Sequence, residues 1–325
     1  MDQTDTLDQD SPGSHAITTV NSELDILEPE TSIDIQVKSL GVGRSNELNL
    51  RIKQNAELPV HSLPPELLLQ VICLHMITEF GSLPKGYYRR LISLSGVCAH
   101  WYNVIRHSPP LWTWIHASDR SEVIEMALQR SSSHPLDIIL RPPVPSDGLL
   151  WTVPASLQSI VNAIIPHSNR WRSLDIAVPS QWVAAVIADL GESPPTLEKL
   201  SFVDVDTIYC SQEYGLLGGK APGLKSLKLN GVSVRWDSEI LHDLAILDLS
   251  WIEFPSTEAI LHALSHSPHL ENLVVYRCST LYLATPSSPS IHLPKLLRFE
   301  IDFDSPAATE NFLQHIERGG RIIFG

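Results

Sequence analysis

The sequence predicts a mixed α/β protein in which a module of three short helices precedes a region of repeated strand–helix units. Two observations lead to this prediction. Three segments between residues 63 and 105 carry apolar side chains at helical spacing. From residue 171 onward, one apolar pattern recurs about every 26 residues, and helical periodicity separates its copies. Stacked units of this kind are expected to form an irregular, curved parallel sheet.

The first helix is predicted to begin at Pro64 and Pro65, because the missing N–H of proline costs nothing in a first turn. Glu66 complements the positive end of the helix dipole there. The apolar side chains that follow are expected to fall on a single stripe made of Leu67, Leu68, Val71 and Ile72.

Two further short helices are predicted. Leu91 and Leu94 lie on a segment that ends at Gly96, where a residue tolerant of positive φ is expected. The third segment has its own apolar stripe, made of Val97, Cys98, Trp101, Tyr102 and Ile105. Three helices this short bury little surface among themselves, so the sequence indicates that a partner covers part of them.

This order of elements resembles an F-box, the helical module by which substrate receptors dock on a cullin-RING ubiquitin ligase. The resemblance rests on the Leu63-Pro64 pair and on the Val97-Cys98-x-x-Trp101 element. It implies that the Skp adaptor, which in turn binds the cullin, contacts Leu63, Pro64, Glu66, Leu67, Leu68, Ile72, Leu94, Val97, Cys98 and Trp101. The Pro-Pro-Leu-Trp run at 109–112 resembles the continuation common in fungal F-box proteins with leucine-rich repeats.

One departure from the F-box pattern bears on docking. Residues Thr78 to Tyr88 lengthen the usual link between the first two helices, and Gly81, Pro84 and Gly86 predict a loop there. This insertion leaves open whether the segment binds an adaptor at all. An unrelated three-helix core segment is the alternative interpretation.

The repeated pattern has the form L-x-x-L-x-L and is typical of leucine-rich repeats. The middle positions of its six copies are Leu174, Leu200, Leu227, Leu247, Leu273 and Phe299. Leu136–Leu140 is expected to be an atypical first strand, and Cys278 occupies the asparagine-or-cysteine position of the motif.

Helices are predicted between the strands. Their apolar stripes are centred on residues 157–165, 182–190, 260–264 and 312–316, and the second has Ser180 as its N-cap and Gly191 as its C-cap. No helix is expected at Asp206–Gly223, a Gly-rich loop, or at Ser233–Ile240, a short connection. Stacking these units predicts an irregular leucine-rich-repeat solenoid with strands on its concave face.

Charge and composition exclude several classes. The net charge is −14, and residues 1–60 hold eleven acids against four bases, so nucleic acid is not an expected partner. The basic cluster Lys85–Arg90 is too short to change this. No run of about 18 apolar residues occurs, and the acidic start at residues 1–5 is unlike a signal peptide, so no membrane partner is expected. The expected location is the cytoplasm, the nucleus or both.

The cysteines Cys73, Cys98, Cys210 and Cys278 are scattered, which predicts that they are reduced. Residues 1–60 lack periodicity and are predicted to be a disordered tail, with a regulatory or partner-binding segment as the alternative.

The signals for enzyme chemistry are weak. Gly218-Gly219-Lys220 resembles the end of a phosphate loop, but Ala221 replaces the Ser or Thr that would hold magnesium. His262 and His266 have the i, i+4 spacing of zinc ligands, with His269 nearby, but Ala263 replaces the catalytic Glu of a zincin. The sequence therefore predicts no catalytic residue, no metal and no cofactor.

The expected function is that of a non-catalytic substrate receptor, with an F-box at residues 61–116 and leucine-rich repeats at 117–325. The alternative is a leucine-rich-repeat scaffold whose first helices only cap the solenoid. A capping role requires their apolar faces to turn inward, whereas docking leaves part of them exposed.

A protein target is expected to bind the concave strand face. The sequence leaves two alternative binding sites open, the loop Asp206–Gly223 and the acidic tail. The candidates are the strand residues between the apolar positions, namely Lys199, Lys228, Ile246, Asp248, Asn272, Val274 and Arg298, with Ser201, Ser226 and Glu300 beside them.

Overall fold

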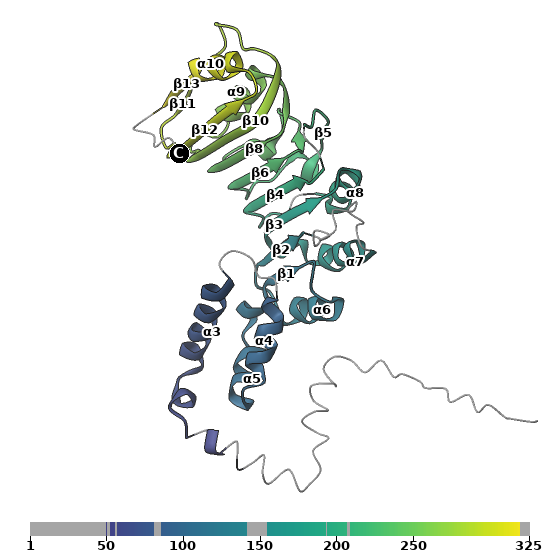
Figure 1. The fold of residues 1–325 in the computed structure, drawn as a ribbon, viewed down its shortest axis with the longest axis vertical. Coiled ribbons are helices and arrows are strands. Elements are labelled where there is room, and N and C mark those ends of the chain that lie inside the picture. The colour runs from purple at the N-terminus through teal and green to yellow at the C-terminus, as the bar shows by residue number, and fades with distance from the viewer. Residues whose placement is uncertain are drawn as a thin grey trace, which may run out of the picture. The chain divides into compact units, whose positions relative to one another are not determined.

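Helices precede and then alternate with strands along the chain (Figure 1). This computed structural model describes residues 50, 53–55, 57–80, 86–141, 155–192, 194–206 and 209–318. The α-helices are α3 Pro65–Phe80, α4 Tyr87–Ser95, α5 Ala99–Arg106, α6 Ser121–Arg130, α7 Ala155–Ile164, α8 Ser180–Leu190, α9 Thr257–Ser265 and α10 Pro306–Gln314. The 3-10 turns are η1 Pro59–Ser62, η2 Pro109–Trp112, η3 Ile165–Arg170, η4 Leu216–Gly219 and η5 Glu239–Leu241. Of the predicted N-terminal tail, residues 1–49 lie outside the described ranges.

Parallel strands form the centre of the fold. Within the described ranges, nine strands make one sheet in the order β1-β2-β3-β4-β6-β8-β10-β12, with β9 paired to β10. The strands are β1 Trp114–His116, β2 Leu136–Leu140, β3 Trp171–Val178, β4 Lys199–Asp204, β6 Ser226–Asn230, β8 Ile246–Ser250, β9 Glu253–Ser256, β10 Asn272–Tyr282 and β12 Arg298–Phe303. Two small parallel pairs join β5 Glu213–Tyr214 to β7 Ser233–Val234 and β11 Ile291–Leu293 to β13 Ile316–Arg318. The predicted α/β class with a parallel sheet is confirmed.

The register of the sheet aligns the copies of the apolar pattern. One line of paired residues crosses six strands and consists of Leu174, Leu200, Leu227, Leu247, Leu273 and Phe299. None of these side chains is more than 3 % exposed. Each of these side chains therefore packs beside its equivalents on the neighbouring strands. A strand–helix unit that is too small to have its own core is stabilised in this way. The strand predicted at Leu136–Leu140 is confirmed as β2, but it is not the first, because β1 pairs with it.

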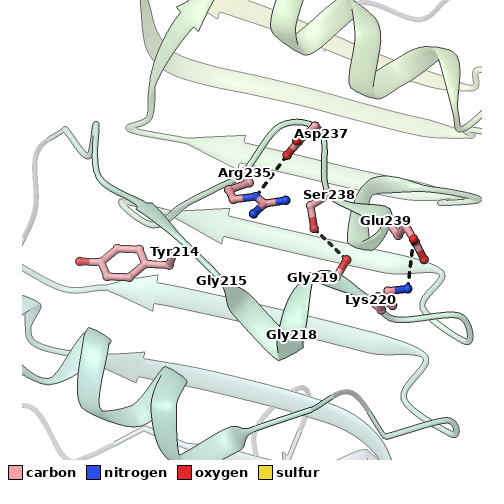
Figure 2. Close-up of a pocket in the computed structure, with 9 residues that line it drawn as sticks. All are labelled: Tyr214, Gly215, Gly218, Gly219, Lys220, Arg235, Asp237, Ser238 and Glu239. Carbon is pink, nitrogen blue, oxygen red and sulfur yellow. Dashed lines mark hydrogen bonds and ion pairs between the residues drawn. The ribbon is translucent and has the colours of Figure 1, made fainter.

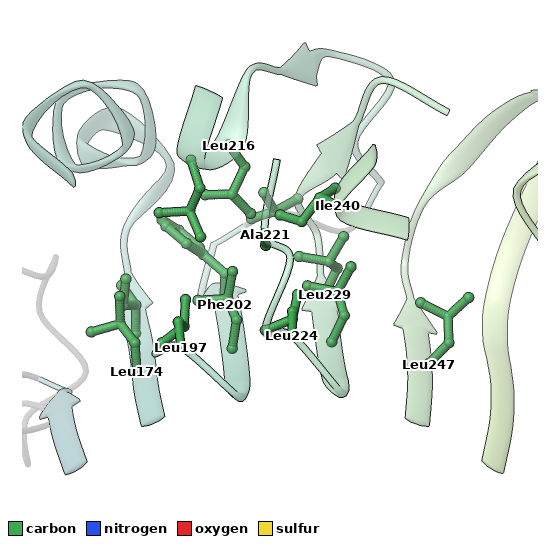
Figure 3. Close-up of a cluster of buried hydrophobic side chains, with 14 of the residues drawn as sticks. Leu174, Leu197, Phe202, Leu216, Ala221, Leu224, Leu229, Ile240 and Leu247 are labelled. Atoms are coloured by element: carbon green, nitrogen blue, oxygen red, sulfur yellow. The ribbon is translucent and has the colours of Figure 1, made fainter. Parts of the chain in front are cut away.

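The core continues from the sheet into the connections. Phe202 of β4 is fully buried and points toward Leu216 of η4, as Figure 3 shows. Leu216 and Leu217 are each 1 % exposed. The segment predicted as a Gly-rich loop at 206–223 thus contains β5 and η4, and its buried leucines cover the sheet where other repeats use a helix. Each such side chain contributes about 1.5–3 kcal/mol of burial free energy.

The helix ends show where local signals worked. Gly191 follows α8 with φ +63°, and Ser256 caps α9 through its Oγ, which accepts from the Ala259 N–H at 3.1 Å. The N-cap predicted at Ser180 is wrong by one residue, because Ser180 is the first residue of α8 and Pro179 is its N-cap. The helical stripe predicted at 312–316 is wrong at its end, because α10 stops at Gln314 and Ile316 lies in β13, paired with Ile291.

The link between the first two helices is shorter than predicted. Helix α3 continues to Phe80 and α4 begins at Tyr87, so the predicted loop at Thr78–Tyr88 is wrong at both ends; Gly81 and Pro84 lie outside the described residues. Tyr87 and Tyr88, the first two residues of α4, are buried. Gly86 precedes α4 with φ +83°, whereas Gly96 has φ −79°, so the positive φ expected at Gly96 is also wrong.

Trp112 joins the helical module to the sheet. Its ring stacks on that of Tyr88 with centroids 5.5 Å apart. The guanidinium of Arg130, the last residue of α6, lies 4.7 Å from the Trp112 ring centroid. The indole Nε1 donates to the Ile105 carbonyl at 2.9 Å, and the Tyr88 hydroxyl donates to the Trp114 carbonyl. These contacts place α4, α5 and β1 in one compact unit that spans Arg51–Gly325. None of the described helices is long and apolar enough to span a membrane.

Asp119, which lies between β1 and α6, predicts a pH dependence of stability. Burial raises the pKa of Asp119 to about 6 from 3.8. The folded state therefore binds its proton more tightly than the unfolded state, and Asp119 makes the protein less stable as pH rises through that window. We expect Asp119→Asn to raise the melting temperature at pH 7 and to have little effect at pH 4. Thermal melts at both pH values check this, and equal effects at the two would contradict it.

Candidate protein-interaction surfaces

Helix α3 is apolar on two adjacent faces, one buried and one exposed. Leu68 and Ile72 are at most 1 % exposed and belong to the core, whereas Leu67, Val71 and Leu74 are 46 %, 47 % and 62 % exposed. The exposed residues follow the i, i+4, i+7 spacing of one helical face. The single stripe predicted from Leu67 to Ile72 is therefore wrong, because adjacent residues on a helix are turned by about 100°. The exposed set, which we call the α3 stripe, consists of Leu67, Val71 and Leu74.

The other predicted adaptor contacts divide by burial. Val97 is 55 % exposed, and Pro64 and Glu66 are also exposed. Those that are half-buried are Leu63, Leu94, Cys98 and Trp101. Leu68 and Ile72 are corrected: they pack in the core and present no surface to a partner.

Three further apolar residues on these helices are exposed, namely Val71, Leu74 and Ile92, and none of them is among the predicted adaptor contacts. Leu74 had a signal, since it stands seven residues after Leu67 on the same face. A contiguous apolar face left in water is typical of interaction sites. The helical module therefore has an inward face and an outward one.

The inward face meets the sheet domain. Tyr88, Leu91 and Ile105 are at most 2 % exposed, and Ile105 accepts the hydrogen bond of Trp112. This packing is what a capping role requires, while the exposed α3 stripe is what a docking role requires. Both conditions hold in the same module.

The predicted target-binding residues lie together on the sheet face opposite the buried leucines. They form two parallel lines across five strands, one of Lys199, Ser226, Ile246, Asn272 and Arg298 and one of Ser201, Lys228, Asp248, Val274 and Glu300. Side chains alternate between the two faces of a strand, which separates these lines from the core. Ser226 is an exception, being only 8 % exposed.

Charges on this face largely neutralise one another. Arg298 donates to Glu300 through two hydrogen bonds of 2.8 and 3.1 Å, which lower the pKa of Glu300. Lys228 Nζ lies 3.6 Å from Asp248 Oδ2. Among the described residues, Lys199 makes no ion pair. Exposed pairs of this kind contribute about 0–1 kcal/mol to stability, so they leave the face polar but weakly charged.

A third line on the same face was not predicted. It lies beyond the L-x-x-L-x-L positions and consists of Val203, Asn230, Ser250, Tyr276 and Asp302. Tyr276 is 44 % exposed. These residues lie outside the L-x-x-L-x-L motif, because the strands continue past its last apolar position.

The Gly218-Gly219-Lys220 segment lines a hollow of about 170 Å³ (Figure 2). Lys220 Nζ pairs with Glu239 at 3.3 Å, and Arg235 pairs with Asp237 at 3.2 Å. Ser238 Oγ donates to the Gly219 carbonyl at 2.8 Å. Because both cations already have acidic partners, the hollow offers a phosphate little positive charge.

The histidines considered as zinc ligands are arranged differently. His266 stacks on His242 with centroids 4.3 Å apart, and its Nδ1 donates to the His262 carbonyl at 2.9 Å. His269 is exposed. Across the described ranges, no group of three or more His, Cys, Asp or Glu is placed to hold a metal ion. The four cysteines are free, and burial raises the pKa of Cys278 to about 12, as expected for a thiol in the core.

Comparison with known proteins adds no relative to this picture. No family model matches the chain, and no curated protein is significantly similar to it. The features that bear on function are therefore the α3 stripe and the sheet face opposite the buried leucines.

Proposed function

We propose that the chain is a non-catalytic substrate receptor of a cullin-RING (SCF) ubiquitin ligase. In this proposal residues 61–116 are an F-box that docks on the Skp adaptor, and residues 117–325 are an irregular leucine-rich-repeat solenoid that recruits a protein target. The observation that carries it is the α3 stripe, because Leu67, Val71 and Leu74 are exposed on a helix whose neighbouring face is buried. Burying such a face against a partner lowers the free energy, because apolar surface is removed from water.

The aligned apolar lines support the leucine-rich-repeat assignment. Equivalent residues 20 to 27 positions apart pair directly across the sheet, as in Leu200 with Leu227 and Leu227 with Leu247. A sheet of this kind presents one face of short polar and apolar side chains to solvent, and that face suits a protein epitope.

The mechanism follows from proximity. A target held on the repeats is brought near the ubiquitin-conjugating enzyme that the cullin carries. The lysines of the target then meet the ubiquitin-loaded enzyme at high effective concentration. The receptor needs no acid, base or nucleophile of its own. The chain would act in the cytoplasm, the nucleus or both, with the adaptor and a protein target as partners and with no cofactor.

A second candidate is a leucine-rich-repeat scaffold unconnected to a ligase. The observation that favours it is the contact of α4 with the first strand, because Tyr88 stacks on Trp112 and its hydroxyl donates to the Trp114 carbonyl in β1. In that case the α3 stripe has no partner of the adaptor type.

Co-elution with the adaptor tests the proposal. We expect the purified full chain and the purified Skp adaptor to form a stable one-to-one complex in size-exclusion chromatography, because the exposed apolar face is then buried. Adding cullin should shift this complex to a larger size. Separate elution of a folded chain and a folded adaptor would contradict docking and favour the scaffold.

A further inference from the structure

Three successive repeats share a turn that favours glycine. Gly231, Trp251 and Arg277 each lie two residues after the last apolar position of the motif, and their φ angles are +63°, +58° and +47°. Glycine adopts this left-handed region freely, whereas a bulky residue there is strained. In the second and third of these repeats, Trp251 and Arg277 therefore place large side chains at a position where the backbone favours glycine. Strain of this kind is often retained at functional sites.

The two strained residues gather aromatic neighbours. The Arg277 guanidinium lies 5.2 Å from the Trp251 ring centroid and 5.6 Å from that of Tyr276. The Tyr209 ring meets Trp251 edge to face at 5.5 Å, and its hydroxyl donates to Asp304 Oδ2 at 2.6 Å. We call Tyr209, Trp251, Tyr276 and Arg277 the aromatic–arginine cluster. Trp251 directly follows β8, whereas Tyr276 and Arg277 lie in the middle of β10, where the pairing with β12 is irregular and where Tyr276 belongs to the third line of the strand face.

Backbone hydrogen bonds hold the cluster in place. The Trp251 N–H donates to the Tyr276 carbonyl at 3.1 Å, and the Cys210 N–H donates to the Trp251 carbonyl at 3.2 Å. Cys278, directly after Arg277, is fully buried. The side chains above are nevertheless accessible, since Tyr209 and Tyr276 are 42 % and 44 % exposed. A rigid base under exposed aromatic side chains is the arrangement that lowers the entropy lost on binding.

Arg277 is the charged member of the cluster and makes no ion pair with any described residue. A guanidinium stacked on rings keeps its in-plane N–H donors, which match the two oxygens of a carboxylate. Tyr, Trp and Arg are also the residues that most often dominate protein interfaces. A dianionic phosphate fits less well, because Asp302 pairs in register with Tyr276 and Asp304 contacts Tyr209.

We propose that the aromatic–arginine cluster reads protein targets by binding a polypeptide segment that presents an Asp or Glu carboxylate to Arg277 and an apolar side chain to Trp251 and Tyr276. This inference rests on the target-binding part of the proposed function and is independent of adaptor docking. It places recognition at one edge of the strand face, where the loop holding Tyr209 meets the sheet.

Paired peptide libraries test the carboxylate. Two nonapeptide libraries, degenerate except for a central Glu in one and a central Gln in the other, are incubated with the immobilised full chain, and retained peptides are quantified by mass spectrometry. We expect about tenfold more retention of the Glu library, as for a hydrogen-bonded charge. Arg277→Gly should reduce this ratio to about one.

Glycine at position 277 separates recognition from folding. Because glycine suits the left-handed backbone, Arg277→Gly should melt at or above the wild-type temperature. Trp251→Gly should keep the Glu preference but lose any enrichment of apolar residues beside the Glu. Lys199→Gln is the matched control, because it removes another exposed cation without an ion pair from the same face, and it should keep the full ratio.

Equal retention of the two libraries by the wild-type chain would overturn the inference, as would a ratio that survives Arg277→Gly or falls equally in Lys199→Gln. Adaptor co-elution of Arg277→Gly is measured in parallel and should be unchanged. A chain that prefers Glu peptides but does not bind the adaptor would refute the ligase role and leave this inference standing.

Discussion

Trp112→Ala is expected to lower the free energy of unfolding by about 3–5 kcal/mol, the largest effect of any single truncation proposed for this chain. Trp112 is 1 % exposed and is enclosed by the Tyr88 ring and the Arg130 guanidinium. Truncation removes both contacts, leaves a cavity, and removes the indole hydrogen bond to the Ile105 carbonyl, which then still accepts from the Ser108 N–H at 3.3 Å. Urea unfolding followed by circular dichroism measures the change.

Trp114→Ala is the matched control. Trp114 stands two residues later and is 38 % exposed, and its backbone carbonyl still accepts from Tyr88 after the substitution. We expect it to cost less than about 1 kcal/mol, as for an exposed side chain. Equal urea midpoints for Trp112→Ala and the wild type would show that the stacked contacts do not stabilise the junction between helices and sheet.

The strand register could be predicted from sequence because it follows the position of each residue within its L-x-x-L-x-L motif. Leu200, Leu227 and Leu247 are paired in the sheet although the steps between them differ, since each occupies the same position of its motif. Burial of one strand face determines which residues must align. The shorter step between Leu227 and Leu247 also predicted correctly a short connection without an α-helix, which contains β7 and the 3-10 turn η5.

The two candidate surfaces were less predictable, for different physical reasons. A helix with apolar residues at 67, 68, 71 and 72 has too wide an apolar arc for sequence to show which side meets the core. Trp251 and Arg277 adopt a conformation that their residue types disfavour, so propensity argues against it. Contacts distant in sequence, such as Tyr209 with Asp304, depend on the completed fold.

Leu67→Ala is expected to weaken binding of the Skp adaptor by about 2 kcal/mol or more, or about thirtyfold in Kd, while leaving the fold intact. Leu67 is 46 % exposed, so its truncation leaves little cavity but removes an apolar anchor from the α3 stripe. Isothermal titration of the variant with purified adaptor gives the affinity, and a thermal melt gives the stability.

Leu68→Ala makes the comparison decisive, because the neighbouring leucine is fully buried. Its truncation should cost about 2–5 kcal/mol of stability. Leu297→Ala, at a side chain 70 % exposed in the repeat region, should change neither quantity. If Leu67→Ala binds the adaptor as tightly as Leu297→Ala does, the outward face of α3 is not the docking surface. The helices would then be better explained as a cap on the first strand, and the scaffold function would be the better explanation.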